Sequence, residues 1–152
     1  MQSDGRQTSA SSAREQLSGL LTAFLAKAPE TTSALLASGD GLKMAWTEQP
    51  ADEADNLAAV TSGLYSLGRQ QFKACPGGTR QVVVEHDGGT LFVMSAGSQF
   101  GDAEAVRTVL AVVTTPRADA GHVGYEMESF IRGLDEHLVV AARVNAFGGQ
   151  GL

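Results

Sequence analysis

The sequence predicts a mixed α/β domain whose elements follow the order α-ββ-α-βββ-α. Three observations predict this class. Residues 79–96 contain two runs of β-branched and aromatic residues around a glycine-rich turn. A shorter pair of apolar runs lies at residues 31–46, and three other segments repeat apolar residues with the 3.6-residue period of a helix. With 152 residues, of which 43% are hydrophobic, the chain can form one domain with a substantial core.

The first segment with helical periodicity follows a polar stretch. Residues 1–12 are rich in serine, glycine and glutamine and contain no apolar anchor, so we expect a disordered tail there. Ser12 to Glu15 form a capping-box pattern that opens a helix. The helix ends near Ala28, before Pro29, and its apolar residues recur at helical spacing: Leu17, Leu20, Leu21, Phe24 and Leu25.

The next segment predicts a short hairpin. The run TTSALLAS at residues 31–38 is apolar, and Leu42 to Trp46 form a second run. Gly39-Asp40-Gly41 stands between them, and these residue types favour a tight turn.

A long second helix is predicted after Pro50. Asp52, Glu53 and Asp55 stand where a helix N-terminus favours negative charge, and Cys75-Pro76-Gly77-Gly78 ends the segment. The expected buried seam consists of Leu57, Val60, Thr61, Leu64, Leu67 and Gln71 or Phe72. The helix also carries many small residues, namely Ala58, Ala59, Ser62, Gly63 and Ser66. Two interpretations of these small residues stay open: tight packing on the chain's own sheet, and a helix pair across a symmetric dimer.

Residues 79–96 are the predicted central hairpin, with His86-Asp87-Gly88-Gly89 as its turn. Successive residues of a strand point to opposite faces of a sheet. Apolar residues occupy both faces of each strand here: Val82 and Val84 against Val83, and Leu91 and Val93 against Phe92 and Met94. This pattern predicts cover on both sides of the sheet, supplied by the rest of the chain or by a second copy.

The last part of the chain predicts a fifth strand and a third helix. Residues 106–113 are rich in valine, leucine and threonine, which suits a strand. Thr115-Pro116 begins the last helix or a turn that leads into it. The residues from 144 to 152 are expected to form a flexible tail. The helix presents one apolar stripe to the core: Val123, Met127, Phe130, Ile131, Leu134 and Leu138.

The composition excludes several classes of partner. The formal net charge is −6, and the clustered lysines and arginines that phosphate backbones require are not expected, so we predict neither a nucleic-acid partner nor direct membrane insertion. Cys75 is the only cysteine, which excludes a disulfide within the chain and a cluster of thiolate ligands. No stretch approaches the ~20 apolar residues of a membrane span. We therefore expect a cytoplasmic protein, which a partner could recruit to a membrane.

Motifs for nucleotide and acyl-transfer chemistry are missing from the sequence. Neither GxxxxGK[ST] nor GxSxG occurs. His86 and His137 are interpreted as solvent-exposed, and His122 with Glu126 makes only an incomplete zinc site. Turn geometry explains three aspartates that stand beside glycine in predicted turns, Asp40, Asp87 and Asp102. We predict no catalytic, cofactor-binding or metal-binding residue.

Four segments, taken in order, resemble the Roadblock/LC7 family. They are SALLASGDGLKMAW, the acid-led helix from Asp52, VVVEHDGGTLFVMSAG and VRTVLAVVTTPRADAGHVGYEMESFI. Their succession at these spacings carries the resemblance, which covers roughly residues 15–142. The chain is most similar to the small Roadblock proteins that actinomycetes encode in operons beside a sensor-kinase-like protein and a Ras-like GTPase.

The resemblance implies a profilin/longin-like α+β sandwich at residues 13–143. Its five-stranded antiparallel sheet would carry the first and third helices on one face and the second helix on the other. In the family, two protomers commonly join edge to edge through the third strand and pair their second helices. By matching position, residues 79–85 would be the dimer edge. The implied interface residues are Ala59, Gly63, Leu64, Ser66, Leu67, Gln81, Val83 and Glu85.

The resemblance also implies a function. We expect a non-catalytic homodimeric regulator or adaptor that binds a Ras-like small GTPase and modulates its nucleotide state or localisation. Any stimulation of hydrolysis is expected to come from positioning the GTPase's own residues. The candidates for an inserted arginine, on exposure alone, are Arg69, Arg80, Arg107 and Arg117. Two alternatives stay open: a passive scaffold that docks on a sensor-kinase-like partner, and a small-ligand sensor with an apolar pocket.

Overall fold

The computed structural model describes residues 3–96 and 108–149 of the chain. Its elements follow the predicted order of helices and strands. They are α1 (Ser3–Lys27), β1 (Thr31–Ser38), β2 (Lys43–Trp46), α2 (Ala51–Gln71), β3 (Gln81–His86), β4 (Gly89–Ala96), β5 (Thr108–Thr114) and α3 (Ala120–Gly149).

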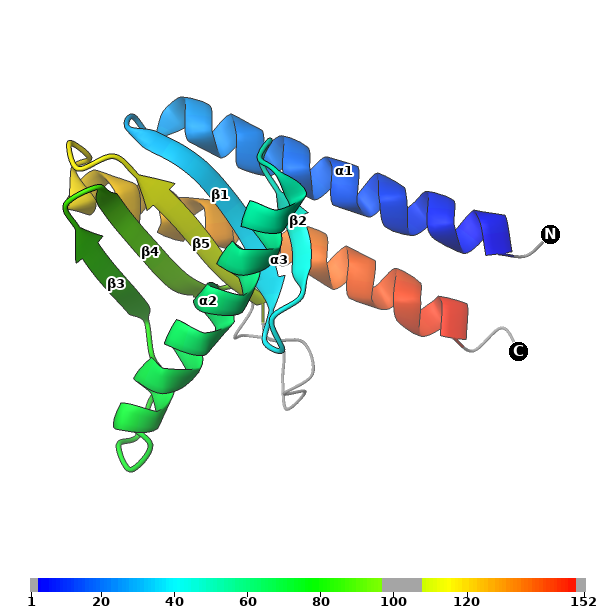
Figure 1. The fold of residues 1–152 in the computed structure, drawn as a ribbon. Coiled ribbons are helices and arrows are strands. Elements are labelled where there is room, and N and C mark those ends of the chain that lie inside the picture. Colours follow the sequence, from blue (N-terminus) through cyan, green and yellow to red (C-terminus); the bar gives the residue numbers. More distant parts are fainter. Residues whose placement is uncertain (1–2, 97–107, 150–152) are drawn as a thin grey trace.

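The five strands form one antiparallel sheet in the order β2-β1-β5-β4-β3. Strands β2 and β3 are therefore its two edges. In Figure 1, α2 crosses one face of the sheet, while α1 and α3 run along the opposite face. The implied arrangement of helices around a five-stranded antiparallel sheet is confirmed.

The larger part of the core lies between the sheet and the helices α1 and α3. The ring of Phe24 on α1 meets the ring of Phe130 on α3 edge to face, with 5.6 Å between their centroids. The predicted stripe of α3 packs into this core as far as the structure describes its side chains; those of His137 and Leu138 lie outside the described part. The buried residues here include Leu21, Leu36, Phe92, Leu110, Val112, Val123, Met127 and Leu134.

Both predicted hairpins are confirmed, and each turn has its own local hydrogen bonds. In β3–β4, His86 pairs with Gly89, and Nδ1 of His86 accepts the backbone N–H of Gly88 at 2.9 Å. This contact gives the exposed His86 a structural role. In β1–β2, the N–H of Gly41 donates to the carbonyl of Ser38 at 3.0 Å. Gly41 has φ +92°, which favours glycine over any residue with a Cβ.

The ends of the chain differ from the expected tails. Helix α1 begins at Ser3, so residues 3–12, predicted to be disordered, are helical, and α3 continues to Gly149 through most of residues 144–152. Extending an existing helix by one residue is far easier than nucleating a new one, and no proline interrupts either extension. The fifth strand begins at Thr108; Asp102, Val106 and Arg107, which entered the sequence predictions, lie outside the described residues.

Candidate functional site: an uncharged helix face beside an open sheet edge

The predicted seam of α2 is wrong in part. Leu57 packs against the core and Leu64 is half-buried. Thr61 is buried, but Val60 and Leu67 are exposed, and Gln71 and Phe72 also face solvent. The sheet-facing residues that are buried are instead small or polar: Ala54, Ala58, Thr61 and Ser62. Because these side chains are short, α2 can lie close to β1, where Leu35 and Ala37 complete a second, smaller core cluster. Of the large apolar side chains of α2, Val60 and Leu67 are turned outward as a result.

A polar contact fixes α2 on the sheet. The hydroxyl of Ser62 donates to the backbone carbonyl of Ser38 at 2.9 Å, at the end of β1. Nearer the C-terminal end of α2, a Cβ added to Gly68 would lie 2.9 Å from a methyl group of Val82 on β3. Gly68 therefore allows the helix to pass directly over the edge strand. The first interpretation of the small residues, packing on the chain's own sheet, holds for Ala58 and Ser62.

Exposed apolar side chains gather on α2 and β3. Seven large hydrophobic residues of the described chain are exposed, and only Leu42 (66%) and Tyr125 (62%) lie elsewhere. The other five come from α2, from its C-cap or from β3, namely Val60 (41%), Leu67 (67%), Phe72 (63%), Val83 (44%) and Val84 (39%). Such a concentration on two consecutive elements is typical of interaction surfaces rather than of scattered exposure.

The outer face of α2 is also uncharged. No charged residue occurs between Asp55 and Arg69. The exposed positions along this stretch include Ala59, Gly63 and Ser66, whose spacing places them on one side of the helix with Leu67. Small residues beside a large apolar one leave room for the backbone of another helix. We call this group, Ala59, Val60, Gly63, Ser66 and Leu67, the α2 outer face.

The two edges of the sheet differ in how they are protected. On β2, the ring of Trp46 lies 4.6 Å from Nζ of Lys43 and 5.3 Å from the guanidinium carbon of Arg14, which belongs to α1. Charged side chains and a covering helix are two of the devices by which edge strands avoid pairing with other chains. On β3, Val83 and Val84 are exposed, and the strand pairs only with β4. The open edge is therefore β3.

The structure gathers the implied interface residues in two groups. Four of the five helix residues lie on the α2 outer face, and Leu64 is half-buried. The strand residues are all exposed, but their register with Met94, Phe92 and Thr90 on β4 places them on the sheet face that α1 and α3 cover. The two groups therefore lie on opposite sides of the sheet (Figure 1). The implied strand residues are Gln81, Val83 and Glu85.

Two exposed residues were missed by the sequence reasoning. Val60 had been assigned to the buried seam, and Val84 had not been assigned to the interface. Val84 pairs with Leu91 and lies on the same face of the sheet as α2. The alternation of side chains along β3 could have indicated Val84, because it places Val82 and Val84 on one face of the sheet and Val83 on the other. The orientation of α2 could not be found from its pattern, because small and large apolar residues alternate around the helix.

The described residues do not bring together a metal site. They contain no group of three histidine, cysteine, aspartate or glutamate side chains that could hold an ion. His122 is exposed, and its backbone N–H donates to Oδ1 of Asp119 at 3.3 Å, as part of the cap that opens α3. Cys75 is a free, exposed thiol. Among the described helices, none is long and apolar enough to cross a membrane.

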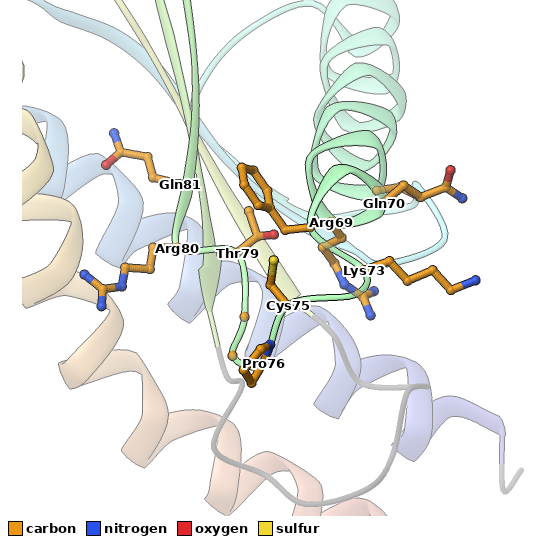
Figure 2. Close-up of a pocket in the computed structure, with 12 residues that line it drawn as sticks. Arg69, Gln70, Lys73, Cys75, Pro76, Thr79, Arg80 and Gln81 are labelled. Carbon is orange, nitrogen blue, oxygen red and sulfur yellow. The ribbon is translucent and has the colours of Figure 1, made fainter.

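The hollows on the surface of the described chain include two, one beside α2 and one beside α3. The larger, of about 700 Å³, lies between the end of α2 and the start of β3 and is shown in Figure 2. The smaller, of about 240 Å³, lies between α1 and α3 and is lined by Phe24, Phe130 and Leu134, among others. Cys75 lines the larger hollow, and Trp46 lines neither.

The element order and the placement of one helix in front of the sheet and two behind it define a Roadblock-type α/β domain. The chain belongs to the Roadblock/LC7 domain family, whose model matches residues 17–114, from α1 to the end of β5. No curated protein matches the chain.

Solved structures agree with this family. A Roadblock/LC7 domain from Streptomyces avermitilis is 40% identical, with a TM-score of 0.71 over 80% of this chain and 97% of that one. MglB from Myxococcus xanthus has a TM-score of 0.70 at 16% identity, covering 83% of this chain and 90% of its own. The gliding protein MglB from Thermus thermophilus has a TM-score of 0.67 at 19% identity, covering 82% and 89% respectively. At these lower identities, the MglB structures show a shared fold.

Proposed function

We propose that this chain is a non-catalytic, homodimeric adaptor that binds a Ras-like small GTPase and modulates its nucleotide state or localisation. The proposal is carried by one observation: the uncharged α2 outer face and the open β3 edge occur in the same chain. Both belong to contiguous elements, and both leave apolar side chains in water. The family to which the chain belongs implies a regulator or adaptor for small GTPases, and this surface suits binding rather than chemistry.

A second copy fits the surface through its symmetry. Two copies related by a two-fold axis present the same patch to each other, and two β3 edges related in this way pair antiparallel. The α2 helix is acidic in its first turn, at Asp52 and Glu53, and basic in its last turn, at Arg69. Antiparallel pairing of two such helices brings each acidic end toward the basic end of its partner. The helix charges therefore favour the same arrangement as the open edges.

The GTPase would then bind a surface that the dimer leaves open. The exposed arginines Arg69, Arg80 and Arg117 are the described candidates for direct action on a bound nucleotide. We expect replacement of each by alanine to leave stimulated hydrolysis within about twofold, because the adaptor acts by positioning the GTPase's own residues. A loss of stimulation in one variant that still binds would instead identify an inserted arginine, which is worth ~10³ to 10⁵ in rate.

The decisive test couples capture to kinetics. The chain is immobilised and exposed to lysate of its source with GDP or with a non-hydrolysable GTP analogue, and any captured Ras-like GTPase is then purified. Its rates of nucleotide exchange and hydrolysis are measured with and without the adaptor. Nucleotide-dependent binding together with a changed rate supports the proposal. Nucleotide-independent binding with unchanged rates, or capture of a sensor-kinase-like protein alone, would favour a passive scaffold.

A further inference from the structure

The larger hollow is basic. It lies where α2 ends and β3 begins, and the cations that line it are Arg69, Lys73 and Arg80. All three side chains are exposed. None of them makes an ion pair within the described part of the chain, whose single salt bridge joins Lys43 to Asp55 at 3.0 Å. These three cations are therefore available to a partner.

The local charge is opposite to that of the whole chain. Residues 56–84 contain these three cations and no aspartate or glutamate. Since the formal net charge is −6, the residues outside this segment together carry −9 against the +3 within it. The expectation that cations are not clustered is thus wrong for this segment, because the total charge conceals a local excess.

We propose that this basic hollow docks an extended acidic segment of a partner protein. In Figure 2, Arg69 and Lys73 project on one side of the hollow, and Arg80 projects on the other. The positive charges therefore line both sides instead of converging on one point. Carboxylates spaced along a peptide can meet charges arranged in this way.

The remaining lining suits a peptide. Phe72 is 63% exposed and offers an aromatic contact, and aromatic and arginine side chains are enriched where binding energy concentrates. Gln70, Thr79 and Gln81 also line the hollow and carry side-chain donors for carboxylate or backbone oxygens. The hollow thus combines charge for orientation with an apolar contact for affinity.

A longer polyanion fits the surroundings poorly. The strand that starts beside Arg80 ends near Glu85 and Asp87, and both of these carboxylates are exposed. A nucleic-acid backbone or an anionic membrane extends beyond a patch of this size and would meet like charge there. An acidic protein segment can be as short as the hollow itself.

The inference does not require the partner to be a GTPase. It can therefore fail while the proposed function holds, and the proposed function can fail while the inference holds. It does share four residues with the implied dimer surface and edge strand, because Ser66, Thr79, Arg80 and Gln81 also line the hollow. The acidic ends of α2 in a second copy are therefore the competing occupant, and the experiment must separate them from a different protein.

The probe is a synthetic peptide of alternating glutamate and serine, titrated into the isotopically labelled full chain and followed by amide chemical shifts. We expect shift changes confined to residues 66–81 and weaker binding at higher salt. A triple variant, Arg69→Gln, Lys73→Gln and Arg80→Gln, is expected to bind about tenfold more weakly. The matched control, Arg117→Gln with Arg132→Gln, removes exposed arginines from outside the hollow and is expected to bind as the unmodified chain does.

Several results would overturn the proposal. They are equal binding by the triple variant, equal binding of a lysine–serine peptide, and tighter binding of inorganic phosphate, of a single-stranded oligonucleotide or of phosphatidylserine vesicles. Sedimentation of the triple variant addresses the competing occupant. If the triple variant fails to dimerise while the control dimerises normally, the hollow belongs to the contact between copies and not to a different protein.

Discussion

Replacing Leu67 by alanine is expected to weaken self-association about a hundredfold without harming the fold. The change removes roughly three CH₂ equivalents, each worth ~0.8 kcal/mol when buried. In the single chain, 67% of Leu67 is exposed, so about two thirds of this energy depends on a second copy. A two-fold interface contains the residue twice. The total is about 3 kcal/mol, or roughly a hundredfold in the dimer Kd.

Sedimentation velocity over a range of protein concentrations measures this effect directly. Tyr125→Ala is the matched control, because Tyr125 is 62% exposed but lies on α3, away from the α2 outer face. Circular dichroism of both variants at low concentration checks that each chain is folded. A folded Leu67→Ala chain whose dimer Kd stays within about threefold of the original would refute the assignment of the interface to α2. A large effect of Tyr125→Ala would move the interface to α3.

Four further changes test the packing of α2 and α3, each by thermal unfolding of the dilute chain. Thr61→Val is expected to stabilise the fold by about 1 kcal/mol, because the buried hydroxyl of Thr61 has no hydrogen-bond partner; a loss of stability would show that it does. Gly63→Ala should add about 1 kcal/mol from helix propensity, since nothing lies within 4 Å of the new methyl, whereas Gly68→Ala should destabilise through the contact with Val82. If the two glycine variants change the melting temperature alike, α2 does not pass over β3 as closely as the contact between Gly68 and Val82 indicates. Asp119→Ala should cost about 1 kcal/mol through loss of the α3 cap, and an unchanged melting temperature would contradict that role.

The strands were predictable because their signals are local. The turn at residues 86–89 and the period-two alternation of Val82, Val83 and Val84 depend on neighbours in sequence, and the structure confirms both. The core-facing stripe of α3 was predictable for a similar reason. Its apolar residues form a single run at helical spacing, from Val123 to Leu134, with no competing apolar side.

The orientation of α2 was not predictable in this way. Its apolar residues surround most of the helix, so side-chain size rather than hydrophobicity decides which side meets the sheet. The shallow space over β1 accepts Ala58 and Ser62 and leaves Leu67 in water. The basic hollow was hidden for another reason, since Arg69 and Arg80 belong to different elements that only the fold brings together. Long-range packing determines both features.

The unequal edges of the sheet also set a limit on assembly size. If two chains join through β3, each end of the shared sheet is a β2 strand whose Trp46 ring is contacted by Lys43 and Arg14. Neither end then offers an unprotected edge to a further chain, and growth by strand addition terminates at two copies. Two unprotected sheet edges would allow repeated strand addition and filament formation, and one protected edge prevents this. In such a dimer the residues around Trp46 would protect both ends of the shared sheet, on the side of the molecule opposite β3.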